Sequence, residues 1–530
     1  MQVLGMVTAF VLLASAALCS GSARFWNWNY PLAGASALLW LLSAGAERGR
    51  PGLTILFLGL LVGLAIFRVP IESPLYHGYV DFVLHRHYIE GILSDGHVLE
   101  RFQSGVYHAT PGYHMEGATV VLASGLGSAN AIIVIGFVDV AVAILVLMVL
   151  GFGMPRTLLA GGAALFLVLS RIGIQWFRYL SATQFAAVLF ALALLVPIRI
   201  AHRKDQFRGM LVLIILGLAL LVTHAPTTVF LSLFLVVFGA WALIAQARRP
   251  LGIRGGGWPW LAMAATFLMA QLFYLSFADE SFFDYYLRSV AGETDASKVV
   301  HDALSPTNTF DFVFTKLDLA AGALLFASGA LALFLRKDAR EHRWLVAFGA
   351  IYWLAIPVLP VALRGILVLD RLAFYALPFA AIVMAAGFWV ARDRSRLAAA
   401  AASLVALSFF VAGAANVEFE TPPFREDLQG IATTAFHPSD LEAARFALDQ
   451  PGPWTTDAHE RALLEIELGR YTVPVFGDQS EPAGLVILRA EEDMERGLQG
   501  SYGPVKVVLP GSALVVWSGG TTQVLAVTPG

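Results

Sequence analysis

Long apolar runs, interrupted by short polar segments, dominate the whole sequence. A helix needs roughly 20 apolar residues to cross the hydrocarbon core of a bilayer. We expect thirteen such spans, at residues 3–19, 31–45, 53–68, 129–151, 157–170, 180–198, 209–223, 226–245, 258–277, 318–335, 344–362, 371–391 and 397–415. Strands of a barrel would alternate apolar and polar positions instead. The pattern therefore predicts an all-α polytopic membrane domain over residues 1–415.

Basic residues in the short connections set the expected orientation. They fall in alternate loops, on the side of the membrane that the positive-inside rule makes cytoplasmic. The clusters are Arg48 and Arg50; Arg199, Arg203, Lys204 and Arg208; Arg248, Arg249 and Arg254; Arg336, Lys337, Arg340 and Arg343; and Arg392, Arg394 and Arg396. We expect a multi-pass protein of a plasma or inner membrane with a cytoplasmic N-terminus. Loops 70–128 and 278–317 would then lie outside, as would the tail after residue 415.

The sequence changes character after residue 415. Ser439 and Glu442 form a capping box at the start of a helix. Short strand-like runs follow at residues 471–476, 484–488, 505–509, 513–517 and 523–527, the last two around a Gly519–Gly520 turn. We expect a small, soluble, extracytoplasmic α/β domain over residues 416–530.

Composition narrows the classes of function. Hydrophobic residues make up 58% of the chain and charged residues 14%, and the formal net charge is -3. This near-neutral charge argues against nucleic acid as a partner. A single cysteine, Cys19, excludes an intrachain disulfide framework and thiolate metal sites. Chemistry therefore has to come from polar residues near the membrane, where ionisable side chains are costly.

The densest group of such residues lies in loop 70–128. His77, Asp81, His85 and Tyr88 are spaced by four, four and three residues, so they line one face if the segment is helical. An aspartate beside imidazoles can act as a general base toward a hydroxyl, or hold a divalent cation through oxygen and nitrogen ligands. A solvated face or a structural Asp–His pair fits the same spacing. The sequence does not decide whether a metal is needed.

A second polar group in this loop runs from Tyr107 to His114. Thr110 suits the N-cap and Pro111 the first position of a helix that we expect to extend through Ala123. The N-terminus of that helix would offer free N–H groups to a phosphate, with His114 in its first turn. An ordinary helix start with a capping histidine is the equal alternative.

The order of these motifs resembles the first outer loop of GT-C-type membrane glycosyltransferases. Asp81 stands four residues before His85, and Tyr107 and Pro111-Gly112-x-His114 follow. The chain is most similar to the prokaryotic branch related to the protein mannosyltransferase and oligosaccharyltransferase families. The resemblance implies a polyprenyl-phosphate-linked sugar donor and Asp81 as the catalytic base. Two extra spans before the loop depart from the pattern. The tail lacks a Trp-Trp-Asp motif, so transfer to asparagine is not expected.

A lipid-phosphate donor needs cations at the outer face of the membrane, where guanidinium groups suit phosphate geometry. Arg364 and Arg371 flank one short outer turn, and Arg171 and Arg178 lie in another. Arginines also anchor helices at the interface, so both interpretations remain open for these residues. The expected donor-binding residues are His77, Tyr107, His114, Arg364, Arg371 and Arg178.

Two more polar residues lie in or beside the apolar runs. Asp139 falls in the middle of span 129–151, where a carboxylate is costly unless an arginine pairs with it or it is protonated. His224 lies between two spans, and we expect it to be a capping or packing histidine.

We therefore expect a glycosyltransferase that moves a sugar from a polyprenyl-phosphate donor to an extracytoplasmic acceptor hydroxyl. Asp81 and His85 are the expected catalytic residues, and the acceptor can be a glycan, a lipid or a protein. A polysaccharide polymerase resembling an O-antigen ligase is one alternative. A transporter is another, and it would show broken polar helices at mid-membrane in paired positions. A non-catalytic envelope scaffold is the third.

Overall fold

The computed structural model describes most of the helical part of the chain and portions of the tail. The described residues are 2–20, 28–44, 51–67, 80–98, 110–151, 158–178, 180–200, 206–248, 257–278, 309–335, 343–355, 369–415, 438–450, 454–455, 484–488, 498–500, 503–505, 514–519 and 522–527.

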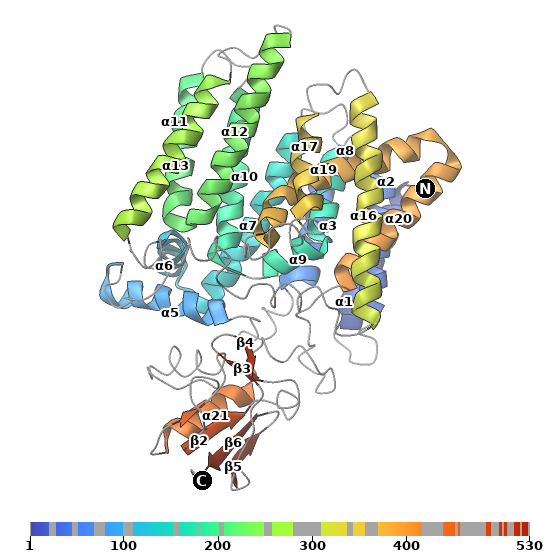
Figure 1. The fold of residues 1–530 in the computed structure, drawn as a ribbon. Helices are drawn as coiled ribbons and strands as arrows, with labels where there is room; N and C mark the ends of the chain where they lie inside the picture. Colours follow the sequence, from blue (N-terminus) through green and yellow to red (C-terminus); the bar gives the residue numbers. More distant parts are fainter. Residues whose placement is uncertain are drawn as a thin grey trace.

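Helices form where the apolar runs predict them (Figure 1). They are α1 (Gln2–Ser20), α2 (Asn29–Ala44), α3 (Pro51–Val62) with the π-helical turn η2 (Gly63–Phe67), α5 (Val80–Asp95), α6 (Gly112–Ser124), α7 (Ser128–Gly151), α8 (Leu158–Val168), α9 (Arg171–Arg178), α10 (Ala182–Ile200), α11 (Gln206–Thr223), α12 (Ala225–Arg248), α13 (Trp258–Ala278), α16 (Thr309–Leu335), α17 (Trp344–Ala355), α19 (Leu369–Arg394), α20 (Arg396–Ala415) and α21 (Pro438–Leu448). Each expected span overlaps one of these helices.

Six described helical stretches are long and apolar enough to cross a membrane. They are Gln2–Cys19, Ser128–Leu147, Pro226–Ile244, Leu317–Leu335, Ala373–Arg394 and Arg396–Ala415. Shorter apolar stretches lie at Leu53–Phe67, Ala182–Pro197, Phe207–Thr223 and Trp344–Trp353. The expected number of thirteen spans stays a prediction.

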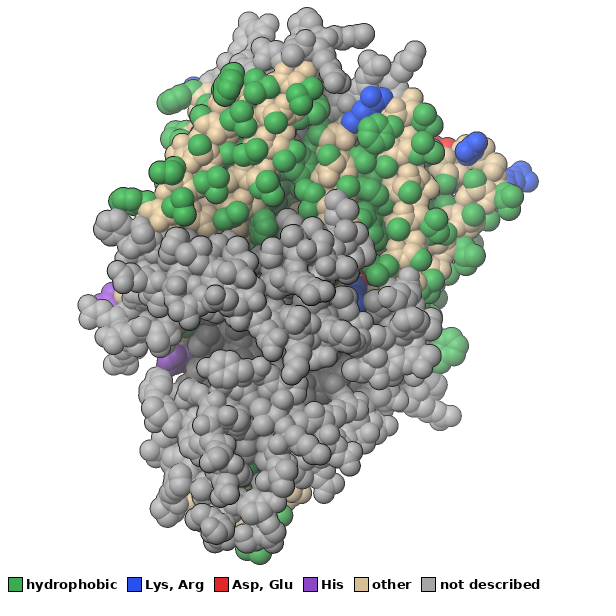
Figure 2. Space-filling view, in the orientation of Figure 1, with side chains coloured by type: hydrophobic (Ala, Val, Ile, Leu, Met, Phe, Trp, Pro, Cys, Tyr) green, Lys and Arg blue, Asp and Glu red, His purple; other side chains and the backbone are tan. Residues whose placement is uncertain are grey.

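Large apolar side chains cover the outward faces of several helices. Leu211, Ile215 and Leu218 on α11 are exposed, as are Met269 and Phe273 on α13. Figure 2 shows this face, at its upper left, as densely hydrophobic. A continuous apolar surface of this kind is unfavourable in water and suits contact with lipid.

Helix α19 is the centre of the helical part. It packs against α8, α16, α17 and α20, and most of its described side chains are buried. Glycines bring it close to α16. A Cβ on Gly329 would lie 2.8 Å from the carbonyl carbon of Val383, and one on Gly387 would lie 2.7 Å from the Gly329 nitrogen. Membrane helices commonly associate through such small residues, because their backbones can then touch.

The tail contains a small sheet. Its strands, in spatial order, are β1 (Trp454–Thr455), β2 (Gly484–Leu488), β6 (Thr522–Val527) and β5 (Leu514–Gly519). Strands β1 and β2 are parallel and the other two pairings are antiparallel. A separate pair joins β3 (Leu498–Gly500) to β4 (Gly503–Val505). Helix α21 packs on β2, β5 and β6. The strand expected at 471–476 lies outside the described residues, and the boundary of a separate domain at residue 416 stays a prediction.

Candidate functional site

Helices α5 and α6 bring polar residues of loop 70–128 together at one end of the helical part (Figure 1). Helix α5 carries Asp81, His85 and Tyr88, as their spacing predicted, and α6 carries His114. The two helices approach closely because α6 has no side chain at Gly117. A Cβ there would lie 2.7 Å from Ile89 Cγ1 of α5. This contact lets the two histidines meet.

His85 and His114 form a hydrogen-bonded imidazole pair. Nδ1 of His85 and Nε2 of His114 lie 2.8 Å apart, so one ring donates its N–H to the lone pair of the other. Tyr88 stacks on His114 with ring centroids 4.7 Å apart, and Tyr113 meets His85 edge to face at 5.0 Å. Four rings from two helices thus form one cluster.

Burial keeps the imidazole pair uncharged at neutral pH. His85 is 0% exposed and His114 is 1% exposed. Loss of contact with water lowers the pKa of His85 from 6.5 to about 3. Burial, and then the charge of His85, lowers the pKa of His114 well below its usual value. Burial also raises the pKa of Tyr88 to about 12. His114 in this environment offers a neutral ring, whereas charge-based phosphate binding would need a protonated one.

Helix α6 begins one residue later than expected. Pro111 is the N-cap, with φ -76° and ψ -5°, and no side chain caps the helix. The expected N-cap role of Thr110 is therefore wrong. The reason is that Pro111 already has helical angles, and its carbonyl accepts the Met115 N–H at 2.9 Å.

The first turn of α6 is fixed by two other elements. The Tyr113 hydroxyl donates a hydrogen bond to the Leu180 carbonyl at 3.0 Å. Leu180 has φ 45°, a left-handed conformation that costs a non-glycine residue of order 1–3 kcal/mol. It joins α9 to α10, and its strained geometry presents the carbonyl to Tyr113. Gly112 packs directly on Thr223 at the end of α11.

We expect the substitution Gly112→Ala to destabilise the protein by about 1–3 kcal/mol, the usual cost of overpacking a tight contact. A Cβ at this position would overlap Thr223 Oγ1 and lie 3.1 Å from Thr223 Cα and from the Val222 carbonyl oxygen. The unfolding midpoint in detergent measures the effect. Gly127→Ala is the control, because a Cβ there meets nothing within 4 Å. Equal midpoints for the two variants would contradict the prediction.

Helix α5 is anchored to the start of α7 by a polar cluster. Arg86 Nε donates to Glu90 Oε1 at 2.9 Å, and Ser128 Oγ donates to the same oxygen at 2.6 Å. Ser128 is the first residue of α7. The cluster therefore fixes the helix that carries Asp81 and His85 to one of the long apolar helices.

Two carboxyl groups lie between α6 and α7. Asp139 is 3% exposed, and Glu116 is its electrostatic neighbour. Within the described part of the chain, neither Asp139 Oδ2 nor Glu116 Oε2 has a hydrogen-bond partner. Burial raises the pKa of Glu116 to about 7. The described residues give Asp139 no arginine partner, and its protonation, the second expectation, stays a prediction.

We expect Asp139→Asn to leave the stability unchanged or to raise it by about 1 kcal/mol, because a neutral amide is cheaper to bury than a carboxylate next to the like-charged Glu116. Asp318→Asn is the matched control. Asp318 is also buried in an apolar helix, but Arg171 is its electrostatic neighbour. Removing the negative charge of Asp318 should therefore lower the unfolding midpoint. A comparable decrease in both variants would show that Asp139 has a cationic partner.

The arginines expected near the donor phosphate lie on neighbouring helices. The expected turn around Arg171 and Arg178 is wrong, because these residues form helix α9. Trp176 of α9 stacks on Phe374 of α19 with centroids 5.9 Å apart, so α9 lies beside the first turns of α19, where Arg371 is. The side chains of Asp81, Arg178 and Arg371 lie outside the described residues, and so do the whole of His77, Tyr107 and Arg364.

His224 is a packing histidine, as expected. Its Nε2 lies 3.2 Å from Thr183 Oγ1, and its Nδ1 lies 2.7 Å from Thr227 Oγ1. Thr227 Oγ1 in turn lies 2.6 Å from the Tyr375 hydroxyl. This His224 network joins α10, α12 and α19 next to the Thr223–Gly112 contact. Sequence reasoning missed Thr183, Thr227 and Tyr375, and also Glu116, because no spacing pattern connects them.

A metal site is not formed by the described side chains. Among them, no group of three or more His, Cys, Asp or Glu residues is placed to hold a metal ion. A divalent cation held with the help of Asp81 therefore stays a prediction.

Comparisons with known proteins establish the fold. The archaeal oligosaccharyltransferase AglB from Archaeoglobus fulgidus, in complex with an inhibitory peptide and a dolichol-phosphate, matches with a TM-score of 0.52 at 13% identity. The Archaeoglobus fulgidus oligosaccharyltransferase tethered with an acceptor peptide containing the NVT sequon gives 0.53 at 12% identity. Both matches cover 86% of this chain and 70% of the other. No protein-family model and no curated protein matches the sequence.

The chain is thus a helical membrane protein with the fold of an archaeal oligosaccharyltransferase. The oligosaccharyltransferase-like fold that the sequence resemblance implies is confirmed, and the particular branch of the family stays a prediction.

Proposed function

We propose that the protein is a membrane glycosyltransferase that takes its sugar from a lipid-phosphate donor. One observation carries the proposal. Asp81 lies one helical turn before His85, and His85 is fixed in a buried four-ring cluster at one end of the helical part, in a protein that folds like an oligosaccharyltransferase. A carboxylate on a rigid support is what a general base requires, because its distance to the acceptor hydroxyl decides the rate.

In the proposed reaction, Asp81 removes the proton of an acceptor hydroxyl. The oxygen attacks the anomeric carbon of the donor in line with the leaving group, so the configuration inverts. The bond from that carbon to the phosphate oxygen breaks, and the lipid phosphate leaves with the electron pair. The acceptor belongs to a glycan, a lipid or a protein.

The imidazole pair supports this chemistry by its position and does not take part in the proton transfer. Both rings are buried and neutral, and they join α5 to α6. We therefore assign His85 and His114 to positioning the turn that carries Asp81. In this respect the proposal differs from the initial expectation, which gave His85 a catalytic role and His114 a role at the phosphate.

In this proposal, arginine side chains bind the donor phosphate. Arg178 ends α9 and Arg371 lies in the first turn of α19, and the Trp176–Phe374 stack holds these two helices side by side. Guanidinium groups bind phosphate oxygens in a bidentate manner. Arg364, His77 and Tyr107 complete the proposed donor site, and a divalent cation is an optional part of it. The site would face the extracytoplasmic side, together with the tail, while the N-terminus faces the cytoplasm.

The proposal is tested with purified protein in liposomes that contain radiolabelled polyprenyl-phosphate sugars and a mixture of acceptor glycans, lipids and peptides. The expected result is release of polyprenyl phosphate together with a labelled glycosylated product. Absence of both, with every donor and acceptor class, would refute the proposal.

A transporter is the second candidate, and the Glu116–Asp139 pair is the observation that favours it. Two carboxyl groups between α6 and α7 could carry protons during transport. The same liposomes distinguish the candidates, because a transporter would move labelled substrate across the bilayer without forming a glycosidic bond.

A further inference from the structure

The His224 network ends on α19 one turn after an arginine of the proposed donor site. Tyr375 stands four residues after Arg371, and residues four apart share one face of a helix. The Tyr375 hydroxyl lies 2.6 Å from Thr227 Oγ1, and that oxygen lies 2.7 Å from Nδ1 of His224. Thr227 is 0% exposed and Tyr375 is 3% exposed, so the bond between them is shielded from water. It therefore fixes the helical turn that begins at Arg371.

Pro378 makes the position of this turn depend on such contacts. It lies inside α19, and its nitrogen has no hydrogen to donate to the Phe374 carbonyl. A proline inside a helix weakens the connection between the turns on its two sides and is a common cause of kinks. Arg371 belongs to the segment before Pro378. The long remainder of α19 therefore fixes the direction of this segment less firmly than an unbroken helix would.

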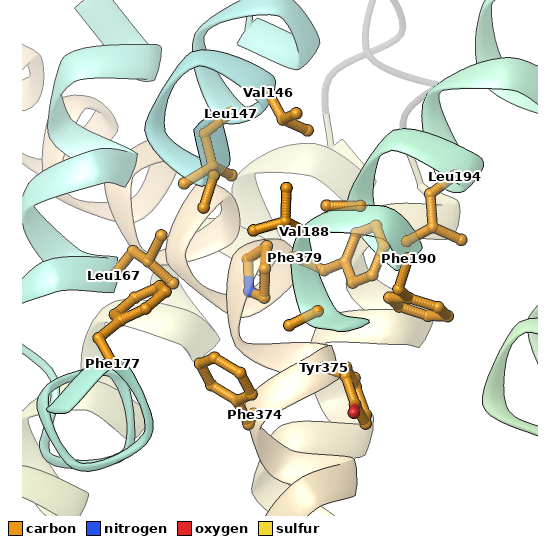
Figure 3. Close-up of a pocket in the computed structure, with 14 residues that line it drawn as sticks. Val146, Leu147, Leu167, Phe177, Val188, Phe190, Leu194, Phe374, Tyr375 and Phe379 are labelled. Carbon is orange, nitrogen blue, oxygen red and sulfur yellow. The ribbon is translucent and has the colours of Figure 1, made fainter. Parts of the chain in front are cut away.

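The other contacts of this segment are largely apolar. Phe374 meets Phe177 of α9 edge to face at 5.3 Å, and Tyr375 meets Phe190 of α10 at 5.2 Å. Figure 3 shows these two contacts on different sides of α19. All four rings and Pro378 line a small apolar cavity, so the packing here is incomplete. Apolar contacts are non-directional, whereas a hydrogen bond fixes both a distance and an angle.

The other end of the network reaches the helices that carry the proposed base. His224 directly follows Thr223, against which Gly112 packs at the start of α6. Helix α6 in turn is hydrogen-bonded to α5. Nε2 of His224 also lies 3.2 Å from Thr183 Oγ1 on α10. One series of contacts thus connects the helix of the proposed base with the helix of a proposed donor arginine.

We propose that Thr227 and Tyr375 are positioning residues for Arg371. The inference rests on the proposed function, in which Arg371 binds the donor phosphate. The bond between Thr227 and Tyr375 holds the segment before Pro378 in the direction that brings Arg371 to the phosphate. Loss of either hydroxyl weakens donor binding. Acceptor binding stays unchanged, because the proposed base lies on α5.

Hydrogen–deuterium exchange tests the structural part of the inference without any assay of sugar transfer. In Tyr375→Phe and in Thr227→Val, the amides of residues 369–377 should exchange about tenfold faster than in the parent protein, the usual effect of one lost hydrogen bond. Residues 380–394, after the proline, should keep their protection. Thr227→Ser should exchange like the parent protein, because serine retains the hydroxyl.

Binding of radiolabelled polyprenyl phosphate to the purified protein tests the functional part. The Kd for this probe should rise about tenfold in Tyr375→Phe and in Thr227→Val, as expected when one arginine–phosphate hydrogen bond is lost. The double variant should bind little worse than either single variant, because both break the same bond. Thr227→Ser should bind like the parent protein. The KM for the acceptor in sugar transfer should not change.

Ser232→Ala is the matched control for Thr227→Val. Ser232 is also buried on α12, but its hydroxyl donates to the Thr228 carbonyl of the same helix at 2.9 Å. Its removal deletes a buried hydroxyl without affecting a bond to α19. The control should keep both the exchange of residues 369–377 and the Kd of the parent protein.

Parent-like exchange and parent-like Kd in Tyr375→Phe and Thr227→Val would overturn the inference. Exchange that accelerates equally on both sides of Pro378 would also overturn it, because the network would then serve only general stability. If the parent protein bound no polyprenyl phosphate and transferred no sugar, the proposed function would fall together with this inference. If the parent and both variants bound the probe and transferred sugar equally well, only the positioning role would be refuted.

Discussion

Sugar transfer should fall by about a hundredfold to ten-thousandfold when Asp81 is replaced by asparagine, the range that a positioned general base contributes. The amide keeps the size of the carboxyl group but cannot accept the proton of the acceptor hydroxyl. Binding of the donor should change little, because the proposed phosphate contacts come from arginines on α9 and α19. The measurement is the release of polyprenyl phosphate from a labelled donor under single-turnover conditions.

Asp95→Asn is the matched control for this substitution. Asp95 ends the same helix, three turns away from the imidazole pair, and accepts a hydrogen bond from Ser94 at 2.9 Å. Its replacement tests whether any loss of negative charge on α5 slows transfer. If Asp81→Asn folded normally and retained the turnover of Asp95→Asn, Asp81 would lose its proposed role as base.

The helical architecture could be predicted because it depends on local sequence. An apolar run long enough to cross a bilayer has to be helical, since only a helix satisfies its backbone groups within one segment. This is why the runs at Ser128–Gly151 and Arg396–Ala415 were located to within about one residue. The short helix Arg171–Arg178 was missed because its polar residues resemble those of an interfacial turn.

The site was predictable only in part, because only some of its features depend on local sequence. The spacing of Asp81, His85 and Tyr88 placed them correctly on one helix. The bond between His85 and His114 could not be predicted, because it depends on the close contact of Ile89 with Gly117. The link from His224 through Thr227 to Tyr375 spans 148 residues between its last two members, and only tertiary packing creates it.

Replacement of both members of the imidazole pair should lower stability by less than the sum of the two single replacements. His85→Phe or His114→Phe removes one side of a buried hydrogen bond and leaves the other ring without it, at a cost of about 1–3 kcal/mol. In the double variant, no such ring remains, so its loss should be smaller than the sum of the two single losses. The unfolding midpoints of the parent protein, the two single variants and the double variant give the coupling energy between the two histidines. Additive losses would show that the bond contributes nothing to stability.

The same pair should make the protein sensitive to acid. Because the pKa of His85 is lower in the folded protein than in the unfolded chain, its contribution to stability is complete above pH 6.5. Below that pH the unfolded chain binds a proton that the folded protein does not. Stability should therefore decrease as the pH falls from 6.5 toward about 3, by up to ~1.4 kcal/mol per pH unit for this histidine.

Protonation of Glu116 changes stability with pH in the opposite direction. Its contribution therefore has to be separated from that of the histidines. Its pKa is raised from 4.5 to about 7, so the folded protein binds a proton more readily than the unfolded chain, and this contribution grows as the pH falls through that range. The difference between the parent protein and His85→Phe/His114→Phe isolates the histidines, because Glu116 is present in both. The double variant should lose less stability than the parent between pH 6.5 and pH 4.5. Parallel profiles would mean that the two rings do not stay neutral in the folded protein.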